Sequence, residues 1–537
     1  MHRYFRIALA LPLALLFAFA LWYRVSSLEA LPEPDGDEAW YAIQYLHLLH
    51  GEPFSAQTPH GNPLSLFHAA IEVPLLMVFK PSLWILRMPS VVTGILAVVL
   101  TYVLGVRMLD RRTATIAAGL MATLPVAIIA ARTGYESCQA PFYSLMLIYL
   151  AHRLRAAWLS VGLAACYFFV HPTMLFLLPV LLAVFLAQSI RRPEGDPARR
   201  PWRLGARLAT IGAVGLGLGV YTLLKPKVAQ MAGDFQMGLK SPHDPVQFLT
   251  LLGRLFFGVG LRTSQREDCA FWLIVPVVLL LGTERLIWAR RWDRLAYVAG
   301  FLASVAGLFA VGGSRIVTGG ATRFGFFLIA PAALAFAAAA ESLLIPPADR
   351  RRAPLRLAQY AGLLAIGWAL LICCRLDCLT KDRLFDGPPR VGESVWTLRT
   401  DARDPKQEAF RLIAADIDRG GDGRGAGGKH VIIAEDWWTH RPIQYLALAR
   451  RDVRVVEVCK TLTTPNDPLR ILREQLQSGA YAVVYPGQPM DIVLRQQIPP
   501  GEVRSWDVSC DGVKCLTVFR REPVAATAAA PRSGAVR

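Results

Sequence analysis

The sequence is poor in charged residues, and this shortage excludes an ordinary soluble protein. Only 18% of the 537 residues are Asp, Glu, Lys or Arg, whereas 54% are hydrophobic. Soluble domains carry about 25% charged residues and cannot hide so much apolar surface. The net charge of +18 would indicate nucleic-acid binding in a soluble protein. Here the arginines stand in short clusters between apolar runs, which is how membrane proteins fix their orientation, so we expect a polytopic membrane protein with no nucleic-acid partner.

Three further absences narrow the class. No small-x-small cleavage site follows the first apolar run, Ile7 to Tyr23, so we expect this run to remain as a first span with its N-terminus in the cytoplasm. The nine cysteines form no zinc pattern. Cys510 and Cys515 are close in sequence and are either a disulfide or two thiols. An internal repeat, which many transporters have, is also missing.

The apolar runs predict about eleven membrane spans in an α-helical bundle. After Ile7 to Tyr23, the expected spans are Leu83–Val106, Ala114–Ala131, Pro141–Ala151, Ala156–Val170, Thr173–Ala187, Leu208–Leu224, Phe271–Ile287, Leu295–Val311, Phe324–Leu344 and Leu357–Cys373. This assignment puts every dense arginine cluster on the cytoplasmic side. Leu64–Phe79 is also apolar, but it is short and contains Glu72, and a crossing there would turn the later clusters outward. We expect it to lie along the membrane surface.

The composition changes after the last predicted span. We expect a membrane domain over residues 1–375, which includes a first outer loop with surface helices at 25–82, then a linker at 376–400. A small α/β domain follows at 401–521 and a disordered tail at 522–537. The predicted elements of the α/β domain are a helix at Gln407–Asp418 and strands at His430–Glu435, Val453–Val458 and Tyr481–Tyr485. The span count places this domain in the periplasm of a bacterial inner-membrane protein.

Two adjacent acids in the first outer loop are the candidates for chemistry. Asp37 and Glu38 open a predicted amphipathic helix that runs through His50, where carboxylates complement the helix dipole. One interpretation is structural, namely N-capping of this helix by Asp35 or Asp37. The other is catalytic, because transfer of a sugar to a hydroxyl or amine needs a base that accepts the proton of the acceptor.

The two adjacent acids resemble a sequence motif of a known family. Asp37-Glu38 in the first outer loop, together with the stretch Leu86-Arg87-Met88-Pro89-Ser90 and the basic turn Asp110-Arg111-Arg112, is similar to the GT-C membrane glycosyltransferases. The closer likeness is to the branch of the protein O-mannosyltransferases, the lipid A aminoarabinose transferase and the rhizobial lipopolysaccharide glycosyltransferases. The resemblance covers residues 20–190 best, the later spans only in pattern, and the C-terminal domain not at all.

The resemblance implies a polyprenyl-phosphate-linked sugar donor held in membrane lipid, and a periplasmic acceptor that is a glycan, a glycolipid or a protein. It implies that Asp37 is the catalytic base and that Glu38 is a second catalytic residue. Candidates for acceptor or metal contacts are Glu136, where relatives have Asp, and His60; no cofactor is certain, and the resemblance leaves the need for a divalent metal open. The anionic leaving group needs cations, for which the candidates are Arg323, Arg315, Lys225 and Arg132.

Two other classes of function remain as alternatives. A transporter or flippase of a lipid-linked sugar would show charges within its spans and an internal repeat, whereas here the acids gather in the outer loops. A non-catalytic assembly factor would tolerate the loss of Asp37.

Overall fold

The computed structural model describes most of the predicted helical region and much of the C-terminal domain. The described residues are 14, 17–26, 28–29, 34–58, 63–191, 201–224, 244–257, 265–313, 325–344, 405–420, 428–434, 437–457, 476, 479–497, 503–510 and 513–521. They form two compact units. Residues 34–44 and those from 405 onward make up one unit, and the other described residues make up the helical unit.

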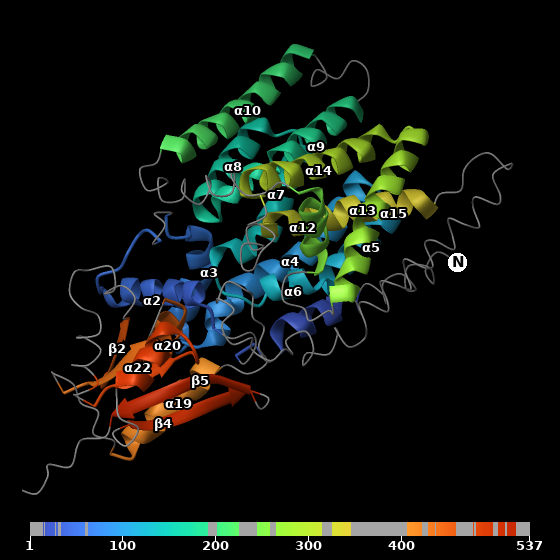
Figure 1. Ribbon diagram of the computed structural model, residues 1–537. Coiled ribbons are helices and arrows are strands. Elements are labelled where there is room, and N and C mark those ends of the chain that lie inside the picture. Colours follow the sequence, from blue (N-terminus) through green and yellow to red (C-terminus); the bar gives the residue numbers. More distant parts are fainter. Residues whose placement is uncertain are drawn as a thin grey trace, which may run out of the picture. The chain divides into compact units, whose positions relative to one another are not determined.

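The helical unit is built from apolar helices, and α2 (Gly36–His50) is divided between the two units, since its residues up to Gln44 belong to the other unit. Residues 17–25 are helical. The elements that follow are α2 (Gly36–His50), α3 (Leu66–Val78), α4 (Leu83–Met108), α5 (Arg111–Thr123), α6 (Pro125–Ala130), η1 (Glu136–Gln139), α7 (Ala140–His152), α8 (Ala156–Phe169), η2 (Pro172–Leu177), α9 (Leu178–Arg191), α10 (Pro201–Leu224), α12 (Pro245–Phe257), α13 (Gln265–Trp288), α14 (Trp292–Gly312) and α15 (Ile329–Leu344). Within this unit α9 packs along α14, and α8 packs along α10 (Figure 1).

Helices occupy the predicted spans wherever both are described, although α5, α7 and α8 have only 13, 13 and 14 residues. Five helical segments of the described part are long and apolar enough to cross a membrane: Leu83–Met108, Pro172–Ser189, Trp202–Thr222, Trp292–Gly312 and Gly325–Leu343. This confirms a membrane protein with several apolar helices, whereas the number of eleven spans stays a prediction. The predicted span Leu357–Cys373 lies outside the described residues.

Helix α3 has the length expected of a surface helix. Its 13 residues span about 20 Å at 1.5 Å per residue, which is less than the roughly 30 Å of a bilayer core. Leu66, Met77 and Val78 are more than half exposed, whereas Glu72 is fully buried. The location of Leu64–Phe79 along the membrane surface stays a prediction.

Helix α12 was not predicted. It lies in the segment that the sequence assigned to an outer loop, and its 13 residues, with Arg254 among them, are too few for a span. It packs against α6, α13 and α15 within the helical unit.

Helix α15 is the centre of the helical unit. In the window Gly325–Leu343, 94% of the residues are buried inside the protein, against 17% for the window in α10. Eight of the 16 residues of α15 are alanine, so its neighbours α5, α13 and α14 can approach closely. Gly282 of α13 makes such a contact, because a Cβ atom there would lie 2.7 Å from the carbonyl oxygen of Ala339.

A buried ion triad joins three of these elements. Arg294, near the start of α14, donates from Nη1 to Oε2 of Glu341 in α15 at 2.5 Å and from Nη2 to Oδ2 of Asp110 at 2.6 Å. Asp110 is also the N-cap of α5, since its Oδ1 accepts from the main-chain NH groups of Arg112 and Thr113. The triad therefore fixes the turn between α4 and α5 against α14 and α15.

The C-terminal domain contains a five-stranded mixed sheet. Its strands are β1 (His430–Ala434), β2 (Val453–Glu457), β3 (Tyr481–Val484), β4 (Val503–Cys510) and β5 (Val513–Arg521), in the order β2-β1-β3-β5-β4. The first three strands pair in parallel, as the predicted α/β pattern requires, and their bounds agree with the predicted ones to within one residue. Strands β4 and β5 form an antiparallel hairpin that the sequence analysis did not predict.

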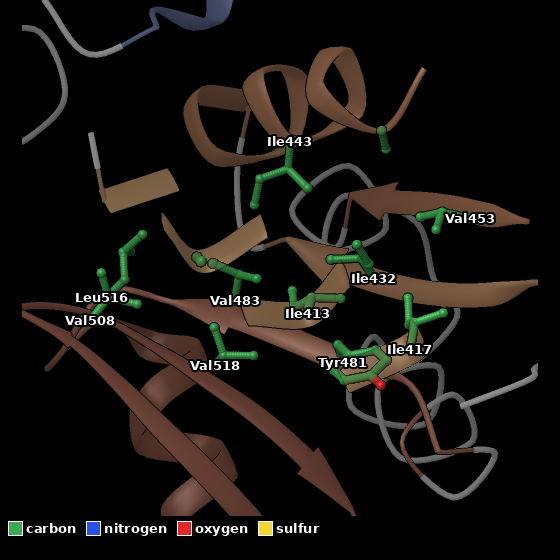
Figure 2. Packing of buried hydrophobic residues seen from close by; sticks show 12 residues of the cluster. Ile413, Ile417, Ile432, Ile443, Val453, Tyr481, Val483, Val508, Leu516 and Val518 are labelled. Carbon is green, nitrogen blue, oxygen red and sulfur yellow. The ribbon is translucent and has the colours of Figure 1, made fainter. Parts of the chain in front are cut away.

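Helices cover both faces of this sheet. On one face, α19 (Pro405–Asp418) and α20 (Trp437–Ala447) pack Ile413, Ile417 and Ile443 on Ile432 and Val483 (Figure 2). On the other face, α22 (Pro489–Gln497) packs Met490 and Leu494 on the neighbouring strand residues. Successive residues of β1 thus enter opposite cores, and all five are buried.

One aspartate anchors α19 to the sheet. Oδ2 of Asp416, which is 4% exposed, accepts from the hydroxyl of Tyr481 at 2.8 Å and from Nη1 of Arg520 at 2.7 Å. Burial and the hydrogen bond to Asp416 raise the pKa of Tyr481, so it stays a donor at neutral pH.

The two cysteines of the candidate disulfide lie on the two strands of the β4–β5 hairpin. Cys515 is buried, and the main chain of Cys510 pairs in register with Val513. A bulge between Val508 and Ser509 shifts the register next to Cys515. The disulfide stays a prediction.

Candidate functional site

Asp35, just before α2, and Glu38, its third residue, cap the N-terminus of the helix. Oδ1 of Asp35 accepts from the main-chain NH of Asp37 at 2.8 Å, and Oε2 of Glu38 accepts from the main-chain NH of Asp35 at 3.1 Å. The bond of Glu38 is one half of a capping box, whereas Asp35 caps the second helical residue in place of the third. Capping therefore rests with Asp35 and Glu38, and Asp37 contributes its main-chain NH to it.

The two predicted catalytic acids differ in environment. Glu38 is fully buried, and its bond to the NH of Asp35 shows that its carboxylate faces back along the chain. Asp37 is half-buried at the first turn, where the partial positive charge of the helix N-terminus favours an anion. The side chain of Asp37 is thus the better placed of the two to meet a reactant.

The second half of α2 is fixed to α3 inside the helical unit. The ring of Tyr45 stacks on His68 with centroids 5.8 Å apart, and its hydroxyl donates to the carbonyl oxygen of Ser65 at 3.0 Å. His68 in turn lies 2.9 Å from Oε2 of Glu72, and both side chains are fully buried. Burial and the charges of Glu72 and Glu136 raise the pKa of Tyr45, so it remains a hydrogen-bond donor.

Three buried arginines of the helical unit, Arg24, Arg87 and Arg132, influence one another electrostatically. Nη1 of Arg132 donates to the carbonyl oxygens of Tyr23 and Ser26 at 2.6 and 2.9 Å. Arg24 donates to the carbonyl oxygens of Met121 and Ala122 and also to that of Ala20, and Arg87 to that of Leu28. All three side chains are fully buried. Burial and the charges of Arg87 and Arg24 lower the pKa of Arg132 to about 9.

Of these three, the sequence analysis proposed only Arg132 as a site residue. Arg24 ends the first apolar run and Arg87 lies inside the apolar helix α4. An ionisable residue within an apolar segment is a functional signal in itself, because it is costly to bury and is kept for a reason. The sequence therefore marks Arg87 as a candidate, but the sequence alone does not indicate that the three arginines influence one another.

The predicted site residues fall into three groups, according to the unit that contains them and to whether the structure describes them. Asp37 and Glu38 belong to the unit that contains the C-terminal domain, whereas Arg132 and Glu136 belong to the helical unit. Glu136 begins η1 and is half-buried. His60, Arg315, Arg323 and Lys225 lie outside the described residues. Within the described part of the chain, no group of three or more His, Cys, Asp or Glu side chains is arranged to hold a metal ion.

Comparison with known proteins establishes the fold. Residues 83–324 match a family model described as a domain of unknown function, DUF6311. No curated protein matches the chain. Among solved structures, ArnT from Cupriavidus metallidurans in the apo state is 14% identical with a TM-score of 0.50, and the match covers 97% of this chain and 99% of that one. ArnT from the same organism bound to undecaprenyl phosphate gives the same score over 96% and 98%.

The archaeal oligosaccharyltransferase AglB from Archaeoglobus fulgidus, in complex with an inhibitory peptide and a dolichol-phosphate, is 12% identical with a TM-score of 0.46. The match covers 84% of this chain and 64% of the AglB chain. The likeness to ArnT extends over nearly the whole of both chains. The chain therefore shares the fold of ArnT, which agrees with the fold that the resemblance implied for the helical unit; the small α/β domain was predicted from its sequence pattern alone.

Proposed function

We propose that this chain is a membrane glycosyltransferase that moves a sugar from a polyprenyl-phosphate donor to an envelope acceptor. The observation that carries the proposal is the position of Asp37, which lies in the first turn of α2, after the first apolar run, in a chain that has the fold of ArnT. The ArnT structure with undecaprenyl phosphate shows that this fold accommodates a lipid phosphate. The periplasmic face of the bacterial inner membrane is the proposed location.

The reaction requires one base and one stabilised leaving group. A hydroxyl or amine of the acceptor attacks the anomeric carbon, the bond from that carbon to the phosphate oxygen breaks, and the polyprenyl phosphate leaves with the electron pair. The proton of the acceptor passes to the carboxylate of Asp37, which acts as general base. Because Glu38 is engaged in the cap, its proposed contribution is to hold the turn that presents Asp37.

The departing phosphate needs positive charge. Arg132, together with Arg24 and Arg87, supplies three cationic groups in the helical unit. Of these, Arg132 is the candidate for contact with the phosphate, and its bonds to main-chain carbonyls fix its guanidinium in place. Arg323, Arg315 and Lys225 remain candidates for direct contact, and Glu136 and His60 remain candidates for contacts with the acceptor or a metal.

The test compares three single substitutions at the start of α2. Asp37→Asn removes the proton acceptor at almost constant size, and we expect turnover to fall by about 10²- to 10⁴-fold, the usual contribution of a general base. Glu38→Gln and Asp35→Asn are matched controls, because both side chains still accept the hydrogen bonds of the cap. We expect these two to keep most of the activity.

The readout is mass spectrometry of lipid-linked sugars and envelope glycans in cells that lack the gene, complemented with each variant at equal membrane abundance. A lipid-linked sugar that accumulates without the gene identifies the donor, and a missing glycan identifies the acceptor. Normal glycan with the Asp37→Asn variant would reject the base assignment. If removal of the gene changes neither pool, the proposal of a transferase is wrong.

A further inference from the structure

Residues that flank Asp37 are held by the C-terminal domain. Lys406, the second residue of α19, is 2% exposed and donates from Nζ to the carbonyl oxygen of Pro34 at 3.1 Å. The two residues are 372 positions apart in the chain. A buried ammonium group is costly unless it is hydrogen-bonded, so this bond fixes the main chain just before the cap of α2.

The second contact lies on the other side of Asp37. The ring of Trp40, which is 5% exposed, lies against the ring of Trp437 with centroids 6.5 Å apart and planes inclined at 33°. Trp437 is the first residue of α20 and is itself held by Arg441 one turn later, whose guanidinium carbon lies 4.6 Å from the ring centroid. Arg441 is fixed by a hydrogen bond to Gln444 at 2.7 Å.

The topology of the sheet explains why Trp437 occupies this position. Helix α20 starts three residues after β1 ends, at the carboxyl end of the parallel strands. Strand β2 lies on one side of β1 and β3 on the other, so the direction of strand addition reverses there. In open α/β sheets, groups that serve a site collect at this edge, next to the reversal.

We propose that Lys406 and Trp437 are positioning residues that hold the turn bearing Asp37. Pro34 stands three residues before Asp37 and Trp40 three residues after it, so the two contacts enclose the capped turn. The C-terminal domain is then part of the catalytic apparatus and not an appended module. The catalytic consequence rests on the proposed function of Asp37, whereas the effect on the order of the turn does not.

The expected effect is on turnover and not on donor affinity. A displacement of about 1 Å in a reacting group can cost about 100-fold in rate. We expect Lys406→Met, which keeps the length of the side chain but loses the donor, to lower kcat about 10- to 100-fold with the donor KM changed less than about twofold. We expect Trp437→Ala to behave in the same way and Trp437→Phe, which keeps an aromatic ring, to retain most of the rate.

The test combines kinetics with hydrogen exchange on the full chain in proteoliposomes, with the donor identified by the lipid analysis above. Amide exchange over residues 36–44 reports the order of the turn directly. Lys514→Met and Trp506→Phe are the matched controls, because they perturb a cation and a tryptophan of the same domain whose contacts include Asp507 and Tyr481. We expect faster exchange over 36–44 in Lys406→Met and Trp437→Ala, and wild-type exchange there in the two controls.

Each outcome decides a separate point. Unchanged exchange over 36–44 in Lys406→Met and Trp437→Ala would overturn the positioning proposal, and so would an equal change in the controls. Faster exchange in these two variants, combined with normal activity of Asp37→Asn, would support the positioning of the turn while rejecting Asp37 as the base. Rescue by Trp437→Phe supports a contact between rings.

Discussion

The triad centred on Arg294 provides the sharpest test of how the helical unit is stabilised. In Arg294→Met the carboxylate of Glu341, whose side chain is only 10% exposed, loses a cation at 2.5 Å. Leaving one partner of a buried pair unpaired costs about 3–5 kcal/mol. The carboxylate of Asp110 is 32% exposed and can be hydrated, so its share is about 0–1 kcal/mol. The unfolding equilibrium should therefore shift by roughly 10²- to 10⁴-fold.

A double variant separates the pair from the general effect of the substitution. Arg294→Met combined with Glu341→Leu removes both buried charges, and such replacements are often neutral or stabilising. We expect the double variant to recover most of the loss, which corresponds to a coupling of about 2–4 kcal/mol. The matched control is Arg411→Met, because Arg411 pairs with Glu408 at 2.6 Å on the surface, with side chains 70% and 42% exposed. We expect this control to leave the stability almost unchanged, because exposed ion pairs contribute little.

The assay is reversible unfolding of the full chain in mixed micelles with increasing SDS, followed by tryptophan fluorescence. A loss below about 1 kcal/mol for Arg294→Met would refute the reasoning, since exposed pairs already reach that value. A double variant as unstable as the single one would also refute it. In that case the two charges would not stabilise each other.

Three other predictions concern the stability of the chain and are measured by the same unfolding assay or by limited proteolysis. Gly282→Ala should destabilise the chain by about 1–3 kcal/mol because its Cβ would meet Ala339, whereas Gly119→Ala, where the space is open, should be neutral or stabilising by up to about 1 kcal/mol. Asp416→Ala should cost about 3–5 kcal/mol and speed proteolysis within 405–521, because the buried arginine that it holds loses its anion; unchanged proteolysis would contradict this. Although partial burial opposes it, the hydrogen bonds from Thr113 and the charge of Arg294 lower the pKa of Asp110. Its stabilisation is therefore complete above its usual pKa of about 4 and is lost as the pH falls through the lower folded value, so wild type and Asp110→Asn should converge only at acid pH.

The elements that follow from local pattern were predictable from the sequence. Strands β1 to β3 are short runs rich in valine and isoleucine, and each was predicted to within one residue of its bounds. The hairpin of β4 and β5 was missed because charged residues interrupt its apolar positions, as in Val503-Arg504-Ser505-Trp506-Asp507. Its strands are defined by their pairing with each other and with β3, which a local window does not contain.

The candidate site likewise contains contacts that a local sequence pattern predicts and contacts that it does not. The spacing of Asp35 and Glu38 is a capping signature that a local pattern contains, and the structure confirms the structural role of Asp35. The contacts of Lys406 with Pro34 and of Trp437 with Trp40 join segments more than 350 residues apart, so no local pattern indicates them. The role of Asp37 stays a prediction, derived from a resemblance and now placed in a defined turn.

The alanine-rich helix α15 restricts how this protein can change during evolution. A helix that faces lipid can exchange one apolar side chain for another with little consequence, and α10 has that freedom. Along α15 the permitted size of a side chain, more than its polarity, decides what is accepted, because Gly282 and other neighbours already lie in contact with it. Related chains should therefore diverge quickly around the periphery of the bundle while small residues persist along its axis.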